Sequence, residues 1–190
     1  MITHAYNILR SWVTTSRRTE IHGVTVTYSG TRETYWNEWQ DVLNEWLPRF
    51  EEAGWLRKLN AIHIDRARFM GDGTGEYQWL FKTICLDPNP RMSRGYNMST
   101  KREHILIHEM AHHAHNLEVG AFPSHKSEVV FNRHKRMFEQ HVSEYAGTDF
   151  YEAVAETATG SVIGHEYPDE LMNAYWKLGG PKELSALREK

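Results

Sequence analysis

Histidines crowd one short stretch of the chain. The stretch HILIHEMAHHAH, residues 104–115, holds five of the twelve histidines. Within it, residues 108–112 read His-Glu-Met-Ala-His, which matches the pattern HExxH. On a helix, residues four apart lie on one face a turn apart, so His108 and His112 can bind the same metal ion. Glu109, beside the first of them, can act as general base for a water that the metal activates.

The residues before and around the motif predict the helix that must carry it. Thr100-Lys101-Arg102-Glu103 fits a capping box, with Thr100 as N-cap and Glu103 reaching back to it. The helix is therefore expected to begin just before His104. Isoleucine, leucine and alanine at 105–107 and 111 make it largely apolar, as in a buried helix.

The motif alone does not decide the chemistry, because a chain rich in His and Glu can match HExxH by chance. The other three histidines of the stretch have weaker claims as ligands. His104 shares the face one turn earlier, whereas His113 and His115 point elsewhere. We expect these three to be supporting or surface residues.

A catalytic zinc site needs a third protein ligand and an open position for water. The metzincin continuation requires Gly at 115 and His at 118, and the chain has His115 and Glu118. That class is excluded. The remaining candidates are His125, thirteen residues after His112, and a carboxylate further along the chain.

The carboxylate candidates lie in VSEYAGTDFYEAVAE, residues 142–156, which reads as a helix that follows a turn. Glu152 and Glu156 are four apart, and small residues around them would let this helix approach the first one closely. Glu152 could bind the metal while Glu156 orients a ligand histidine. Alternatively, Asp149 and Glu152 form a capping box and Glu156 is an ordinary surface carboxylate. The spacing leaves both interpretations open.

The two motifs together resemble the lethal-factor-like zinc peptidases, which include the catalytic domain of anthrax lethal factor and small relatives in phages and bacteria. In that family, the tyrosine of a Tyr-(Gly/Ala) pair precedes the metal-binding glutamate by seven residues, and an Ala-Glu pair follows. Tyr145 precedes Glu152 by seven, and Ala155-Glu156 follows at the family spacing. The resemblance covers roughly residues 100–160.

This resemblance implies a zinc metallopeptidase of the gluzincin type that hydrolyses peptide bonds. It implies that His108, His112 and Glu152 bind Zn²⁺. Glu109 would be the catalytic base, and Tyr145 would donate a hydrogen bond to the oxyanion. The partner would be a peptide or protein substrate.

A second resemblance competes with the first. HEM-x-H is also the form found in SprT-like peptidases, whose third ligand is a histidine within about the next twenty residues. His125 could fill that role, although Lys126 stands where that family usually has Gly. A third alternative is a non-catalytic binding or structural module in which the metal only adds stability. Glu109 and Tyr145 argue against it, because a structural site needs neither a base nor an oxyanion donor.

The rest of the sequence predicts the elements around the site. Five apolar residues spaced 3, 4, 3 and 4 apart form one stripe on a helix over 33–53: Trp36, Trp39, Leu43, Trp46 and Phe50. We also expect a helix over 3–15, strands over 23–28, 61–64 and 76–86, and a turn-rich break at 71–75. The prolines at 88 and 90 end the last strand. These elements predict an α+β fold with a small mixed sheet, and the resemblance implies a zincin-like minimal metallopeptidase with an HExxH helix.

The strand over 76–86 is expected to form the upper edge of the sheet, where an extended peptide can add as another strand. Trp79 and Phe81 would neighbour such a peptide. For these two aromatic side chains we favour core packing over substrate contact.

The composition and net charge indicate which kinds of binding partner to expect. A chain of 190 residues suits a single domain, 1–190, and the net charge of −3 gives no reason to expect nucleic acid or an anionic membrane as partner. Cys85 is the only cysteine, so no intrachain disulfide can form, and its apolar neighbours predict a buried, inert thiol. We find no signal peptide or membrane span, which favours a cytoplasmic protein and leaves virion association open.

Overall fold

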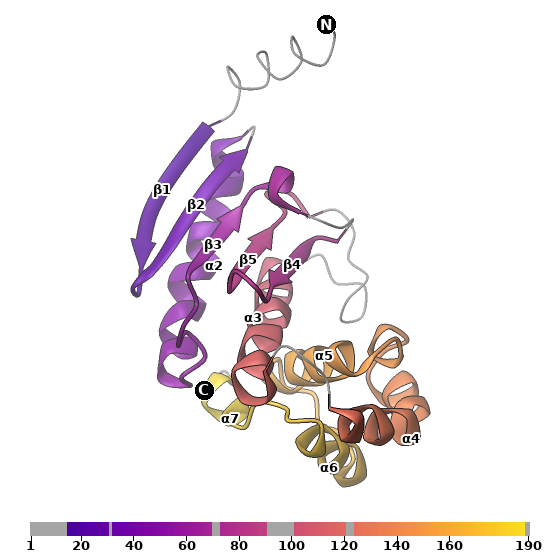
Figure 1. Cartoon of the computed structure of the whole chain (residues 1–190). Coiled ribbons are helices and arrows are strands. Elements are labelled where there is room, and N and C mark those ends of the chain that lie inside the picture. The colour runs from indigo at the N-terminus through magenta and orange to yellow at the C-terminus, as the bar shows by residue number, and fades with distance from the viewer. Residues whose placement is uncertain (1–14, 31, 70–72, 91–100, 121–123, 189–190) are drawn as a thin grey trace, which may run out of the picture.

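The computed structural model describes residues 15–30, 32–69, 73–90, 101–120 and 124–188 (Figure 1). These residues form a five-stranded mixed sheet and six α-helices, which confirms the predicted α+β class with a small mixed sheet. The strands are β1 (Thr15–Ile21), β2 (Val24–Gly30), β3 (Ala61–Ile64), β4 (Gly75–Gln78) and β5 (Thr83–Leu86). Their order in the sheet is β1-β2-β3-β5-β4, so β4 forms one edge.

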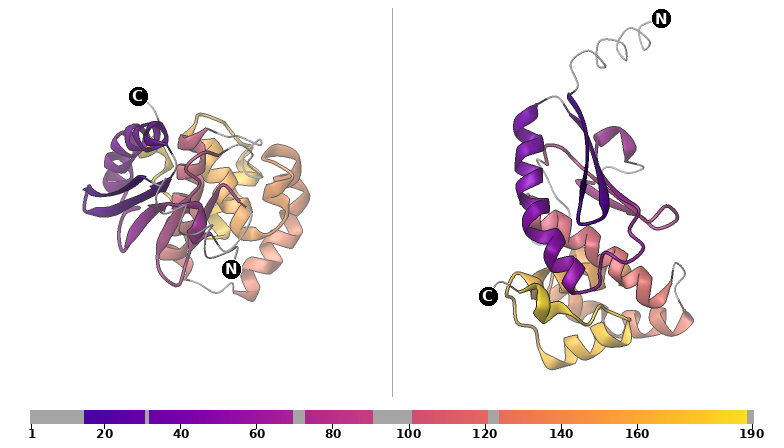
Figure 2. Two further views of the ribbon diagram at one scale, coloured as in Figure 1. Left: turned by 90° about the horizontal axis from the view of Figure 1, so that it is seen from above. Right: turned by 90° about the vertical axis from the view of Figure 1, so that its left-hand side faces the viewer.

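One face of the sheet is apolar and carries two helices. Parallel pairing of β2, β3 and β5 aligns two rows of fully buried side chains: Val26, Ile62 and Ile84, then Tyr28, Ile64 and Leu86. Helices α2 (Glu33–Glu52) and α3 (Arg102–Val119) pack against this sheet (Figure 2), and their buried side chains join the same hydrophobic core. The opposite face is more polar, and there Thr27 Oγ1 lies 2.7 Å from His63 Nδ1.

Helix α2 confirms the stripe prediction, because all five apolar residues of the stripe are buried. Trp39 Nε1 donates to the Asp87 carbonyl oxygen at 3.0 Å, which attaches the helix to the end of β5. Cys85 on β5 is fully buried, as predicted. Burial, together with nearby Glu76, raises the pKa of its thiol to about 11, so the thiol is unreactive at neutral pH.

Four helices follow α3: α4 (His125–His141), α5 (Phe150–Val162), α6 (Asp169–Lys177) and α7 (Leu184–Leu187). Helix α5 packs along α3, and every residue from Ala153 to Val162 is buried. Small side chains in this run allow the close approach that the sequence predicts. Asp149 caps α5 by accepting the backbone N–H groups of Tyr151 and Glu152. Within the described part of the chain, no helix is both long and apolar enough to cross a bilayer.

Strand β1 is absent from the sequence-based prediction. Its sequence TSRRTEI is almost entirely polar, so no apolar alternation marks it. It pairs only with β2, at the edge of the sheet, where backbone hydrogen bonds rather than side-chain burial hold it. Of the helix expected over 3–15, residues 3–14 lie outside the described residues, and Thr15 belongs to β1.

The single strand expected over 76–86 is wrong. The chain reverses at residues 79–82 and forms the antiparallel pair β4 and β5. The turn contains no Gly, Pro, Asn or Asp, and Lys82 adopts the positive φ of 50° that such residues usually supply. Core packing is also wrong for the two aromatic residues of the turn, because Trp79 is 46% exposed and Phe81 is 56% exposed.

The start of α3 is close to the prediction, but its cap differs. The helix begins at Arg102, and the N-cap residue is Lys101, which makes no side-chain capping bond. The predicted capping box with Thr100 as N-cap is therefore wrong, and Thr100 itself lies outside the described residues. Glu103 instead sits in the first turn, where a carboxylate interacts favourably with the helix dipole.

Candidate metal centre

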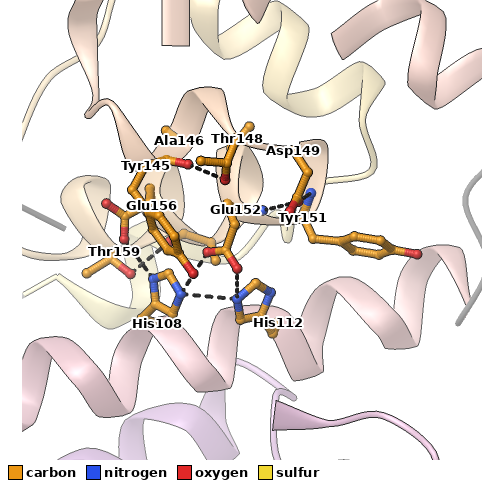
Figure 3. Close-up of polar contacts among 12 residues, drawn as sticks. His108, His112, Tyr145, Ala146, Thr148, Asp149, Tyr151, Glu152, Glu156 and Thr159 are labelled. Atoms are coloured by element: carbon orange, nitrogen blue, oxygen red, sulfur yellow. Dashed lines mark hydrogen bonds and ion pairs between the residues drawn. The ribbon is translucent and has the colours of Figure 1, made fainter. Parts of the chain in front are cut away.

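Two helices bring together three side chains of types that commonly bind metal ions (Figure 3). His108 and His112 project from α3, and Glu152 reaches toward both from the facing helix α5. The two histidine Nε2 atoms are 3.1 Å apart. Glu152 Oε2 lies 3.2 Å from His108 Nε2, and Glu152 Oε1 lies 3.5 Å from His112 Nε2. One ligand atom from each residue falls within 4.8 Å of the other two.

These separations fit a metal ion. Ligands arranged tetrahedrally at about 2.0–2.1 Å from a zinc ion lie about 3.3–3.4 Å from one another. The 3.1 Å between the two histidine nitrogens lies near that value, as do the shortest contacts of the two Glu152 oxygens, 3.2 Å from Oε2 to His108 and 3.5 Å from Oε1 to His112. His108 and Glu152 are also largely buried, with 9% and 15% of their side chains exposed. The group could therefore hold a metal ion.

The charges in the group also favour a cation. Burial opposes the charged form of Glu152, but the facing His112 and His108 outweigh it and hold the pKa of this carboxyl far below its usual range. Burial likewise opposes the charged form of His108, yet hydrogen bonds to Glu152 and Glu156 raise its pKa well above the ordinary value. The carboxylates around His108 thus stabilise positive charge at this point.

Glu156 supports the ring of His108 from its other side. The carboxylate is fully buried, and its Oε1 lies 2.8 Å from His108 Nδ1. This contact fixes the ring so that Nε2 faces Glu152. Ser143 Oγ donates to Glu156 Oε2 at 2.8 Å and accepts the Ala146 N–H at 3.0 Å. The interpretation of Glu156 as a surface carboxylate is therefore wrong.

Glu109 lies beside the three residues but is not one of them. It is only 6% exposed, and the backbone N–H of Tyr77 on β4 donates to its carboxylate. Burial raises the pKa of Glu109, an effect that nearby His108 and His112 partly offset. Gly75 makes room for this side chain, because a Cβ at that position would lie 2.5 Å from Glu109 Oε1.

Tyr145 reaches the group from the short 3-10 turn that precedes α5, η3 (Tyr145–Gly147). Its hydroxyl hydrogen-bonds to Glu152, and its ring stacks on His108 with centroids 6.3 Å apart. Burial and the nearby Glu152 carboxylate raise the pKa of the phenol above its usual value, so it stays protonated and can donate. The structure thus places Tyr145 beside the candidate ligands.

A cavity of about 440 Å³ opens over these residues. The cavity is lined by residues of α3, of α5 and the turn before it, and of β4 and the segments on either side of it: Gly73, Gly75, Glu76, Tyr77, Trp79, His108, Glu109, His112, Asn116, Tyr145, Tyr151 and Glu152. No Lys or Arg lines it within the described residues. A ligand can therefore reach the candidate metal ligands, the Glu109 carboxylate and the Tyr145 hydroxyl from one side.

His125 does not join the group. It is the first residue of α4, its side chain is 91% exposed, and its Nδ1 lies 3.9 Å from Glu128 Oε2 on the same helix. The geometry brings Glu152 rather than His125 to the two α3 histidines.

His113 and His115 are not part of the candidate ligand group, as expected, but neither lies at the surface, because both are fully buried. His113 Nε2 lies 3.0 Å from the Arg57 carbonyl oxygen, and His115 Nε2 lies 2.9 Å from the Leu178 carbonyl oxygen. Burial lowers both pKa values to about 4, so each ring is neutral and anchors α3 to a neighbouring segment. His104 is partly buried one turn before His108 and is not part of the candidate ligand group.

Several residues of the site were not found from the sequence. Asn116 lines the cavity four residues after His112, so extending the helix face by one turn would have identified it. Gly75, Tyr77 and Ser143 carry no comparable signal, because the sheet and the turn before α5 bring them to the site.

Compared with models of protein families, with curated proteins and with solved structures, the chain shows no match.

Proposed function

We propose that this chain is a zinc-dependent peptidase of the gluzincin type, with a zincin-like fold. The observation that carries the proposal is the convergence of His108, His112 and Glu152 with the buried Glu109 in one cavity. A purely structural metal site would not need a buried carboxylate beside the ligands and facing the same cavity. The resemblance of the two motifs to lethal-factor-like peptidases supports the assignment of peptide bonds as substrate.

Two histidines and a glutamate form a ligand set that catalytic zinc sites use, with one position left for water or substrate. When bound there, zinc would supply a Lewis acid that polarises the scissile carbonyl and lowers the pKa of a water toward about 7. Glu156 would hold the His108 ring in the ligand orientation through the 2.8 Å contact at Nδ1.

Glu109 is the general base of this proposal. Its carboxylate takes a proton from the attacking water and later delivers it to the leaving amine. The raised pKa suits this role, because a base whose pKa lies nearer the working pH also returns the proton more readily. The Tyr77 N–H and the space above Gly75 position the carboxylate at the cavity wall.

Tyr145 is the oxyanion donor. The phenol is protonated and lies against Glu152, so it can turn its hydroxyl to the oxygen that becomes negative during attack. Strand β4 is at the sheet edge and contributes Tyr77 to the cavity, and Trp79 lies directly after it. An extended peptide could add to this edge. Among the described residues, no Lys or Arg lines the cavity and could attract the phosphates of nucleic acid.

The direct test is hydrolysis of unfolded casein and of a mixed peptide library. The purified chain is expected to cleave both, to lose the activity after zinc is removed with a chelator, and to recover it when zinc is returned. Hydrolysis that persists after complete removal of metal would contradict the proposal, as would the absence of any cleaved peptide from the zinc-loaded chain.

Tyr145→Phe is expected to lower kcat by about 10²–10³-fold with little change in KM or zinc content. The oxyanion exists only near the transition state, so loss of its donor affects kcat rather than substrate binding. Phe keeps the ring that stacks on His108. Steady-state kinetics on a peptide that the wild type cleaves provides the measurement, and an unchanged kcat would show that the hydroxyl has no catalytic role.

Gly75→Ala is expected to reduce kcat by on the order of 10²-fold, because the new Cβ would displace the Glu109 carboxylate. That Cβ would also lie 2.9 Å from Ile105 Cγ2, so the new methyl group cannot avoid Glu109 by moving toward Ile105. Zinc content should stay at the wild-type level, since neither Gly75 nor Glu109 belongs to the ligand group. Kinetics and elemental analysis on the same sample test both parts, and wild-type kcat would contradict the placement of Glu109.

A further inference from the structure

Asn116 ends a chain of hydrogen-bonding groups that runs from the protein backbone to the cavity. It lies one helical turn after His112 and lines the cavity. Its Oδ1 is 3.1 Å from the Tyr77 hydroxyl oxygen, which is also 3.1 Å from His113 Nδ1. At the far end, His113 Nε2 lies 3.0 Å from the carbonyl oxygen of Arg57.

The protons in this series of hydrogen bonds can be assigned one by one, starting at the Arg57 carbonyl. A carbonyl oxygen only accepts, so His113 Nε2 must carry the hydrogen that it donates to Arg57. The imidazole is fully buried, and the charged side chain that acts on it is the cation Lys82. Among the described residues no carboxylate pairs with this ring, so a second ring proton would be an unpaired buried charge, which is unfavourable. The Nδ1 atom is therefore bare and needs a donor.

Tyr77 has one hydroxyl proton, and the bare Nδ1 of His113 takes it. The Tyr77 oxygen can then only accept from Asn116. The carboxamide oxygen of Asn116 has no proton to give, whereas its Nδ2 has two. Half a turn of the carboxamide exchanges these two atoms, so Nδ2 faces Tyr77 and Oδ1 takes the other position.

We propose that Asn116 presents its carbonyl oxygen to the cavity and accepts a hydrogen bond from a backbone N–H of the bound peptide. The peptide part of this inference rests on the proposed function. The hydrogen-bond chain through Tyr77 and His113 fixes the orientation of the amide before substrate arrives. Asn116 is thus a substrate-positioning residue with defined polarity: it recognises a peptide N–H and not a peptide C=O.

The orientation is tested without any substrate. In ¹⁵N-labelled wild type near pH 7, His113 is expected to show a protonated Nε2 and an unprotonated, hydrogen-bonded Nδ1. Tyr77→Phe keeps the ring and removes only the hydroxyl, so it should shift the Nδ1 resonance and leave Nε2 protonated. A His113 with both nitrogens protonated, or with the proton on Nδ1, would overturn the inference.

The peptide contact is tested with matched substrates. A peptide that the wild type cleaves is remade with each backbone N–H near the scissile bond replaced in turn by an ester oxygen. One replacement is expected to raise KM about 3–10-fold, the effect of losing one neutral hydrogen bond. In Asn116→Ala that ester and its parent should have the same KM, while the exposed α3 variant Glu118→Ala keeps the wild-type difference.

The outcomes separate this inference from the proposed function. A wild type that cleaves no peptide overturns the proposed function, and the peptide contact with it. A wild type that cleaves, but shows no ester effect that Asn116→Ala removes, overturns the Asn116 contact alone. An ester effect of equal size in wild type and Asn116→Ala does the same.

Discussion

Glu109→Gln is expected to abolish measurable peptide hydrolysis while the chain keeps its metal and its fold. Gln has nearly the same shape and can still accept the Tyr77 N–H that meets Glu109, but it cannot take a proton from water. General base catalysis typically contributes about 10²–10⁴-fold, so the loss should reach at least that range. The measurement is kcat/KM on a peptide that the wild type cleaves, together with zinc content by elemental analysis.

A matched control lies on the same helix. Glu118→Gln makes the same chemical change at an exposed position of α3 outside the site cavity, and it should behave as wild type. If Glu109→Gln cleaved at the wild-type rate, Glu109 would not be the base. If it lost zinc as well as activity, the carboxylate would have to act on the metal site rather than on a proton.

Glu152→Ala is expected to lose its metal, whereas His125→Ala should keep it. Removing Glu152 leaves only the two α3 histidines of the group, since His125 is exposed on α4. Removing a ligand should weaken zinc binding by more than the roughly 10–100-fold that is typical when only a supporting partner of a ligand is removed. Glu156→Ala, which removes such a partner, should fall within that smaller range. Zinc titration of the three variants orders these effects.

The pair of variants also separates two families. The SprT-like alternative assigns the third ligand to His125, so it predicts that His125→Ala loses zinc and Glu152→Ala retains it. That reversed pattern would contradict the ligand set proposed here. Melting temperatures measured after complete removal of metal would confirm that neither variant simply fails to fold.

Periodic and local signals allowed part of the fold to be predicted. The apolar stripe of α2 specifies both the helix and its buried face, and all five of its residues are in the core. A cap at Asp149, which the spacing left open, follows from local backbone chemistry and is present at the start of α5. These features depend on residues close together in the sequence, so the sequence alone determines them.

Features that depend on distant partners were missed. Polar β1 is a strand because β2 lies beside it, and its own residues give no sign of this. The turn between β4 and β5 lacks the usual turn residues, so the sequence predicted one continuous strand across it. The two aromatic residues of that turn were expected in the core because they are large and apolar, yet they are exposed because the chain reverses there.

The site shows the same division. The spacing of His108 and His112 fixes their common helix face, and the structure agrees. Spacing could not choose between Glu152 and His125, since the choice depends on whether α5 or α4 packs against that face. Of these two helices, α5, with its small residues, packs along α3. The burial of His113 and His115 also escaped prediction, because their carbonyl partners are 56 and 63 residues away in sequence.

The metal content of the purified wild-type chain tests the central claim most directly. After repurification in zinc-containing buffer and removal of unbound metal, elemental analysis is expected to find about one zinc per chain, the stoichiometry of a single site with two histidines and a carboxylate. A chain that retains no zinc under these conditions would contradict the metal centre, and with it the proposed peptidase.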